Sequence, residues 1–133
     1  MLHTETVAKR TLDLIKKLSQ DEFLKDFTLV GGTALALQIG HRISVDIDLF
    51  SKNSFNSLDI AEHLKKNYPT QNIVTAKEIN NVAGFISDVK VTLIAHQYKD
   101  VSAPILDQGI KMASLDDIAA MKIHDMARNL RQN

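Results

Sequence analysis

The stretch LVGGTALALQIGHRISVDIDLF, from Leu29 to Phe50, decides the fold class of this chain. An apolar run stops at Gly31-Gly32, a segment of strong helix formers follows, and Gly40 suits the end of that helix. Apolar residues then alternate with Asp46 and Asp48, which is the period of a β-strand. The pattern predicts a short strand at residues 27–30, a glycine turn, a short helix and a second strand.

Asp46 and Asp48 are candidate metal ligands. Residues two apart on a strand point the same way, so the two carboxylates lie roughly 6–7 Å apart at the backbone. They repel each other, and burial increases that cost unless donors, a cationic side chain or a divalent metal offset it. Carboxylate oxygens suit Mg²⁺ or Mn²⁺, and magnesium sites often combine one or two carboxylates with substrate phosphates. The alternative is a solvated strand face, because the D-x-D tripeptide is common.

Gly31 and Gly32 form a candidate phosphate site. They follow a strand and open a helix, which exposes backbone N–H groups at a helix N-terminus, and Thr33 adds a hydroxyl. The alternative is a plain strand-to-helix turn. Taken together with the two aspartates, this turn supplies the second half of a nucleotide–metal site.

The remaining patterns predict a mixed α/β fold in a single domain over residues 1–133. Amphipathic periodicity predicts helices, and alternating or β-branched runs predict strands. The helices are expected at residues 4–19, 57–68 (capped by Ser57) and 115–130 (opened by Ser114), and three further strands at 72–79, 82–87 and 89–96. We therefore expect one mixed β-sheet of about five strands with flanking helices, the last three strands forming an antiparallel meander.

Composition excludes several classes of protein. The chain has 133 residues, 44% of them hydrophobic, which suits one domain with a real core. Lys plus Arg and Asp plus Glu are 16 each, so net charge gives no case for coating nucleic acid or a membrane. There is no cysteine, which excludes disulfides and thiolate zinc sites, and no apolar run approaches the ~18 residues of a membrane helix. We expect a cytoplasmic protein with no membrane partner.

The strand, Gly-Gly-Thr turn, short helix and D-I-D-L run resemble the signature of the nucleotidyltransferase superfamily, which is shared in outline with DNA polymerase beta. The full string GGTALALQIGHRISVDIDLF is similar to the AbiEii/AbiGii toxin family of nucleotidyltransferases. Residues 112–128, MASLDDIAAMKIHDMAR, carry that family's S-x-x-D-I-A-A-M-K pattern. The resemblance extends from about residue 27 to residue 128, which is most of the chain.

This resemblance implies a function and a set of site residues. Gly31, Gly32 and Thr33 would contact the triphosphate of a nucleoside triphosphate (NTP), and Asp46 and Asp48 would bind Mg²⁺. An acceptor hydroxyl would attack the α-phosphate and release pyrophosphate. Transfer RNA is the candidate acceptor and a cognate antitoxin the candidate protein partner.

The last helix offers two further candidates. Leu115, Ile118, Ala119 and Met126 are predicted to form one apolar stripe with Lys122 in its middle. That lysine either reaches the anionic site or extends past the stripe to water. The family pattern places a lysine and then an arginine here, so Lys122 would help hold the nucleotide and Arg128 would assist.

Arg42 precedes the D-x-D strand, where it either contacts phosphate or forms a structural salt bridge. Two features depart from the family. Thr92 occupies the slot in which polymerase-beta-like enzymes place a third carboxylate, while Asp88, four residues earlier, is expected in a turn. The chain also ends at NLRQN, so we expect a domain without the family's C-terminal helical half and an exposed apolar patch that favours a homo-oligomer.

Three hypotheses follow from these patterns. The first is an AbiEii-type nucleotidyltransferase that uses NTP and magnesium. The second is a non-catalytic nucleotide-binding or interaction module. The third is an antitoxin-like nucleotidyltransferase that modifies a toxin partner. Thr92 and the chain end predict a protein that binds NTP–Mg²⁺ but transfers nucleotides very slowly or not at all.

Overall fold

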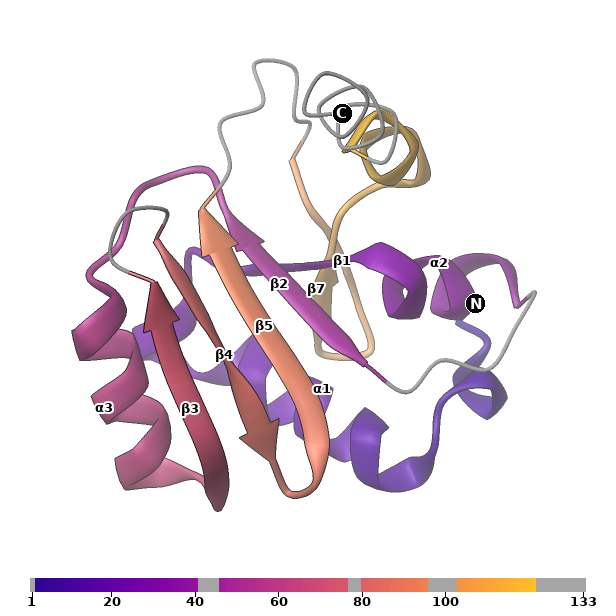
Figure 1. Ribbon diagram of the computed structural model, residues 1–133. Coiled ribbons are helices and arrows are strands. Elements are labelled where there is room, and N and C mark those ends of the chain that lie inside the picture. Colours follow the sequence, from indigo (N-terminus) through magenta and orange to yellow (C-terminus); the bar gives the residue numbers. More distant parts are fainter. Residues whose placement is uncertain (1, 41–45, 77–79, 96–102, 122–133) are drawn as a thin grey trace, which may run out of the picture.

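A computed structural model describes residues 2–40, 46–76, 80–95 and 103–121. These residues form a mixed seven-stranded sheet with the strand order β3-β4-β5-β2-β1-β7-β6 (Figure 1). The strands are β1 (Thr28–Val30), β2 (Ile47–Ser51), β3 (Thr70–Ala76), β4 (Asn81–Ile86), β5 (Val89–Ala95), β6 (Ile105–Asp107) and β7 (Ile110–Met112). The helices are α1 (Lys9–Gln20), α2 (Gly31–Ile39) and α3 (Ser57–Asn67), with 3₁₀ turns at Thr4–Thr6 and Glu22–Leu24 and a helical segment at 115–121.

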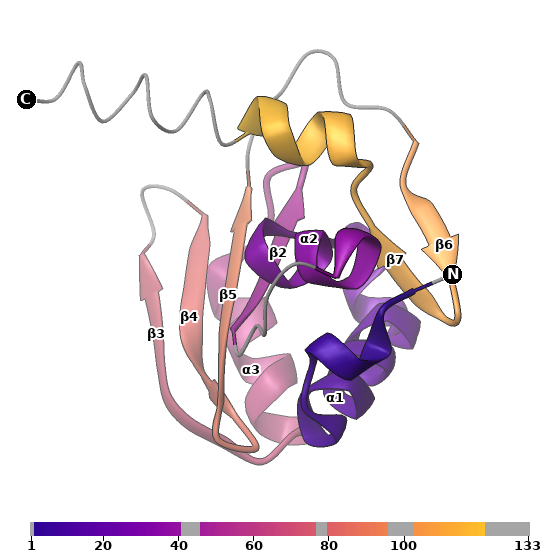
Figure 2. The same cartoon turned by 90° about the vertical axis from the view of Figure 1, so that its right-hand side faces the viewer.

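The helices α1 and α3 cover one face of the sheet (Figures 1 and 2). Each buries one apolar stripe, which comprises Leu14, Ile15 and Leu18 on α1 and Ile60, Ala61 and Leu64 on α3. They meet strand residues that alternation directs to the same side, including Ile47, Val91 and Leu93, none of them more than 2% exposed. The other face of β2 and β5 carries Asp48, Lys90 and Thr92, and neither α1 nor α3 covers it.

The mixed α/β class is confirmed, but the sheet has seven strands rather than about five. The two missed strands, β6 and β7, form a hairpin whose turn residues Gln108 and Gly109 both have positive φ, 52° and 77°. A two-residue hairpin turn of this kind suits the twist of the strands it joins. The hairpin enters the sheet because β7 pairs with β1 in parallel, Leu29 opposite Met112. The predicted meander of β3, β4 and β5 is confirmed, and its turns use positive φ at Asn80, Ser87 and Asp88.

The helix expected over residues 4–19 is divided in two. The hydroxyl of Thr6 donates to the carbonyl of His3 at 2.7 Å, and Val7 is extended at φ −129°, so the regular helix begins only at Lys9. Local side-chain bonding of this kind competes with helix continuation. The cap of α3 is also one residue earlier than predicted, because the side chain of Asn56 accepts the N–H of Asp59.

In the last helical segment the predicted cap is confirmed, and the predicted apolar stripe is wrong at Leu115 and Ala119; its other members Lys122 and Met126 lie outside the described residues. Ser114 Oγ accepts the N–H of Asp117 at 3.2 Å. The buried face carries Asp117, Ile118 and Met121, whereas Leu115 is 40% exposed and Ala119 is exposed. The predicted stripe and the observed buried face share Ile118, and each has helical spacing. A pattern this short could not show which side of the helix packs inward. Among the described residues no helix is both long and apolar enough to cross a membrane.

A polar cluster joins the end of α1 to the end of α3. Asp21 Oδ2 accepts the hydroxyl of Tyr68 at 2.7 Å and lies 2.7 Å from His63 Nε2. The ring of Phe23 stacks on His63 at 4.3 Å. Burial alone raises the pKa of Asp21, but hydrogen bonds from His63, Tyr68 and the backbone of Phe23 outweigh it and leave the pKa below the ordinary 3.8. Burial and the bond to Asp21 raise the pKa of Tyr68.

This cluster makes a stability prediction. Tyr68→Phe removes a donor to a carboxylate and should lower the free energy of unfolding at neutral pH by about 1–2 kcal/mol. Because the pKa of Asp21 is lower in the folded chain, its ionised carboxylate stabilises the fold above about pH 3.8. That stabilisation is lost as the pH falls through the pKa of the folded state. The difference in unfolding free energy between Tyr68→Phe and the parent should therefore become smaller at acidic pH. Urea titrations at several pH values measure this difference. An equal difference at all pH values would contradict the assignment.

Candidate active site

The glycine turn and the D-x-D strand meet at one point. In the antiparallel pairing of β1 with β2, Val30 lies opposite Asp48, and α2 starts directly after Val30. Gly31 has φ +74°, and a Cβ placed on it would lie 2.6 Å from Asp48 Oδ2. Only glycine fits that conformation and that contact. The predicted phosphate turn and the predicted metal ligand are therefore direct neighbours.

Thr33 connects the same helix to the other aspartate. Its side chain is buried, and its hydroxyl donates to the backbone carbonyl of Asp46, immediately before β2. This bond fixes the entry of the D-x-D strand relative to the first turn of α2. The observed role of Thr33 is thus to position Asp46, while its contact with phosphate stays a prediction.

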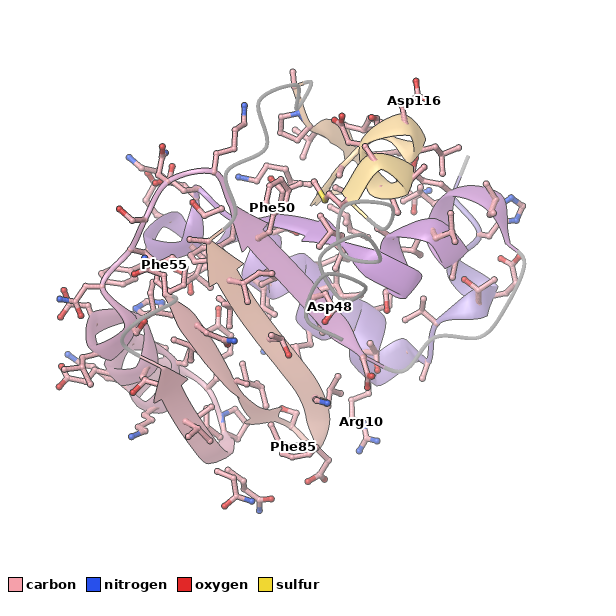
Figure 3. The ribbon with its side chains drawn as sticks, turned by 45° about the horizontal axis from the view of Figure 1, so that its top comes forward. Arg10, Asp48, Phe50, Phe55, Phe85 and Asp116 are labelled. Carbon is pink, nitrogen blue, oxygen red and sulfur yellow. The ribbon has the colours of Figure 1, made fainter. Side chains whose placement is uncertain are left out.

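Asp48 occupies an electrostatically unfavourable place. It projects from β2 on the face that α1 leaves open (Figure 3). Burial raises the pKa of its carboxyl, the charge of Asp46 raises it further, and Lys90 on β5 acts in the opposite direction. In the described part of the chain, neither Asp46 nor Asp48 takes part in an ion pair within 4.0 Å. A bound cation would relieve this repulsion.

The chemistry of these groups fits magnesium or manganese held jointly with a nucleotide. The described residues contain no group of three or more His, Cys, Asp or Glu side chains that could hold a metal. Two carboxylates are too few for a metal site made only of protein ligands, but they suit Mg²⁺, which takes its remaining oxygens from phosphate and water. When bound, the metal would supply charge stabilisation at the phosphates.

The sheet register identifies the neighbour of Asp48 on the next strand. In the parallel pairing of β2 with β5, Asp48 lies opposite Thr92. The position where a third carboxylate is expected is therefore neutral. Asp88 does not replace it, because it lies in the β4–β5 turn with φ 65°, and its carboxylate is 3.9 Å from the guanidinium of Arg10. It is four residues from Thr92, roughly 13 Å along a strand.

The structure thus gathers Gly31, Gly32, Thr33, Asp46 and Asp48 at one junction. The other predicted nucleotide-binding residues, Arg42, Lys122 and Arg128, lie outside the described residues, and their roles stay predictions.

The sequence analysis missed Lys90, the described positive charge that lowers the pKa of Asp48. The available signal was its place two residues before Thr92, on the same face of β5.

Solved structures with a similar backbone define the class of this fold. A candidate nucleotidyltransferase of Thermotoga maritima matches with a TM-score of 0.61 at 18% identity, over 99% of this chain and 94% of that one. The T. maritima CCA-adding enzyme complexed with tRNA matches with a TM-score of 0.55 at 22% identity, over 69% of this chain and 22% of that one. A candidate nucleotidyltransferase of Helicobacter pylori gives 0.54 at 20% identity, over 86% and 58%. The fold is that of a nucleotidyltransferase.

The sequence model of the nucleotidyl transferase AbiEii toxin family, a type IV toxin–antitoxin system, matches residues 13–78. The resemblance to AbiEii nucleotidyltransferases is thereby confirmed. An uncharacterized protein of Aquifex aeolicus, aq_aa25, is 29% identical over 118 residues, which are 86% of this chain. The chain spans about half, 56%, of the length of that relative.

The contact between Gly31 and Asp48 gives a direct prediction. Gly31→Ala places a methyl group against the carboxylate and forces alanine into positive φ, which costs about 1–2 kcal/mol. We expect lower stability by about that amount and a displaced Asp48, seen as weaker Mn²⁺ binding in the presence of NTP. Gly32→Ala is the matched control for stability, because Gly32 lies in α2 without positive φ. Equal unfolding free energies for the two variants would contradict the assigned role of Gly31.

Proposed function

We propose that this chain binds an NTP together with Mg²⁺ or Mn²⁺ and acts on its α-phosphate as an AbiEii-type nucleotidyltransferase. The observation that carries the proposal is the close approach of Gly31 to Asp48, with a virtual Cβ-to-Oδ2 distance of 2.6 Å. A phosphate group at the N-terminus of α2 and a metal on Asp48 would thus be near enough to share oxygen ligands.

The residues take distinct parts in the proposed step. The first N–H groups of α2, at Gly31 and Gly32, hold the phosphates, while Asp46 and Asp48 hold the metal ions. An acceptor hydroxyl forms a new P–O bond at the α-phosphorus, the bond to the bridging oxygen breaks, and pyrophosphate leaves. The hydroxyl proton passes to a base, and the neutral Thr92 beside Asp48 is not one. Lys122, Arg42 and Arg128 are proposed to add positive charge around the phosphates.

The solved relatives support a nucleotide substrate and suggest an acceptor. CCA-adding enzymes of the same fold have been solved in complex with ATP, with CTP and with transfer RNA. For this chain we propose an NTP as donor and transfer RNA as acceptor. We also propose a cognate antitoxin as protein partner, on the basis of the family resemblance, and a cytoplasmic location.

A second function has its own supporting observation. Thr92 lies opposite Asp48 in the parallel β2–β5 register, where a carboxylate would assist removal of the acceptor proton. Without that group, a nucleotide-binding module without turnover remains the alternative. Both proposed functions include binding of the metal and the NTP, and they differ only in whether the nucleotide is transferred. Binding and transfer therefore require separate experiments.

Binding is the first of these experiments. Mg²⁺ should bind weakly alone and more tightly with NTP, because phosphates complete its coordination. Asp48→Asn should abolish the Mg²⁺-dependent part of NTP binding in isothermal titration calorimetry. Asp88→Asn is the matched control, since it neutralises an exposed carboxylate in the β4–β5 turn, and it should bind like the parent. Parent-like binding by Asp48→Asn would show that the aspartate pair is structural.

The second experiment measures nucleotide transfer. We expect the parent to transfer radiolabelled nucleotide to bulk transfer RNA, or to itself, very slowly or not at all. Thr92→Asp places a carboxylate beside Asp48 and should raise the initial rate by about 10²-fold, the lower range for general-base assistance. Thr92→Asn, of similar size and uncharged, should not. Robust Asp46-dependent labelling by the parent would show instead that the reaction needs no third carboxylate.

A further inference from the structure

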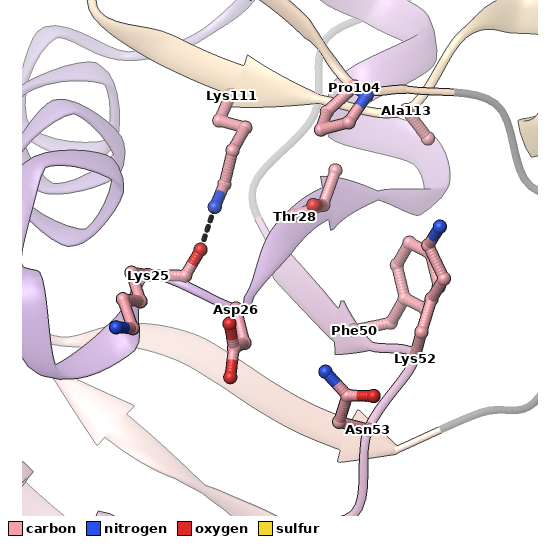
Figure 4. A pocket seen from close by; sticks show the side chains of 9 residues that line it. All are labelled: Lys25, Asp26, Thr28, Phe50, Lys52, Asn53, Pro104, Lys111 and Ala113. Carbon is pink, nitrogen blue, oxygen red and sulfur yellow. Dashed lines mark hydrogen bonds between the residues drawn. The ribbon is translucent and has the colours of Figure 1, made fainter.

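A second polar feature lies on the sheet face that carries Asp48. It is a pocket of about 290 Å³ whose walls include Lys25, Lys52, Lys111, Asp26 and Asn53 (Figure 4). Thr28 and Phe50, which oppose each other in the β1–β2 register, also line it. Phe50 is two residues beyond Asp48, so alternation directs both side chains to the same face, roughly 7 Å apart along the strand.

The pocket concentrates positive charge in a chain whose acidic and basic residues are equal in number. Three lysines and one carboxylate, Asp26, line the pocket. The lysines come from three separate segments: Lys25 follows the 3₁₀ turn at Glu22–Leu24, Lys52 follows β2, and Lys111 lies in β7. No ion pair within 4.0 Å involves any of these lysines in the described parts of the chain. The excess of positive charge among the lining residues suits an anionic ligand.

Lys111 is held in place within this cluster. Its ammonium donates to the backbone carbonyl of Lys25, as Figure 4 shows. Burial lowers the pKa of Lys111, and the charge of Asp26 opposes that shift. The remaining donors of Lys111, the ammonium groups of Lys25 and Lys52, and the amide of Asn53 are the groups that phosphate oxygens accept from.

The pocket lies on the opposite side of Asp48 from the glycine turn. Along β1, Thr28 precedes Val30, and Gly31 follows Val30 into α2. Asp48, opposite Val30, therefore lies between the glycine turn and the lysine pocket. If the triphosphate occupies the glycine turn, the lysine pocket is left for the other reactant.

We propose that the pocket formed by Lys25, Lys52 and Lys111 binds a backbone phosphate of an RNA acceptor and so places its terminal hydroxyl near Asp48. This inference rests on the proposed nucleotidyl transfer. A small recess with lysine and amide donors suits a single phosphate group better than the flat contact of an acidic protein. A bound RNA phosphate would neutralise part of the excess positive charge of the pocket.

The test compares two double variants that remove the same charge. Lys25→Gln/Lys52→Gln changes the pocket and spares Lys111, which also bonds to the backbone. Lys65→Gln/Lys66→Gln is the control, because both lysines are exposed in the last turn of α3. That helix packs on the sheet face opposite the one that carries Asp48. Each protein is titrated into a short fluorescein-labelled single-stranded RNA in EDTA, over a series of salt concentrations. NTP–Mg²⁺ affinity is measured in parallel by calorimetry.

We expect the pocket variant to bind RNA about tenfold more weakly and its log–log salt slope to fall by about 0.7, which is the amount for one lost phosphate contact. The control should keep the parent slope, and both variants should bind NTP–Mg²⁺ like the parent. Equal losses in the two variants, absence of RNA binding by the parent, or competition by poly-aspartate as effective as by RNA would overturn the proposal. A loss of NTP affinity confined to the pocket variant would also overturn it, because the lysines would then serve the donor.

Asp48→Asn separates this inference from the proposed function. That variant should lose Mg²⁺-dependent NTP binding and keep the parent's RNA affinity in EDTA. If Asp48→Asn binds NTP–Mg²⁺ normally while the pocket variant still loses RNA, the proposed metal site fails and the RNA pocket stands.

Discussion

The close approach of the backbone at Gly31 to the carboxylate of Asp48 is the constraint on which the site depends. It is possible because β1 and β2 are paired with Val30 opposite Asp48, and because the residue after Val30 has no side chain. Thr33 strengthens the same junction through its bond to the carbonyl of Asp46. The start of α2, the start of β2 and the backbone of both aspartates are thereby fixed relative to one another before any ligand arrives, which reduces the ordering cost of binding.

The same arrangement carries an electrostatic cost. Burial and the charge of Asp46 raise the pKa of Asp48, so between about pH 3.8 and the raised value the folded chain binds more protons than the unfolded chain. Without metal, stability therefore falls as pH rises from about 3.8 through the raised value, the reverse of the behaviour of Asp21. Groups perturbed in this way are typical of functional sites, because structure alone rarely requires two neighbouring carboxylates. The cluster around Asp21, on the other side of the sheet, offsets part of this cost through satisfied hydrogen bonds.

Local signals were enough to predict much of this fold. Gly40 ends α2 with φ +71° and Ser114 caps the last helix, because each depends on residues only a few positions apart. Features that depend on how distant segments pair and pack could not be predicted from the sequence. The sequence could not show that Gly31 rather than Gly32 touches Asp48, or which side of residues 115–121 faces inward. The lysine pocket was also hidden, since Lys25, Lys52 and Lys111 are far apart in sequence and meet only through the β1–β2 and β1–β7 pairings.

The central claim is that metal and triphosphate meet at the junction of Gly31 and Asp48. Paramagnetic broadening tests it most directly, because Mn²⁺ shortens the relaxation of nearby nuclei and reports location as well as affinity. In ¹H–¹⁵N spectra of the parent with NTP and substoichiometric Mn²⁺, the account predicts selective loss of the amide signals of Gly31, Gly32 and Ile47. The amide of Asp88, in the β4–β5 turn, should broaden less than these at each Mn²⁺ concentration. Broadening centred elsewhere, with Gly31 and Gly32 unaffected, would contradict the account.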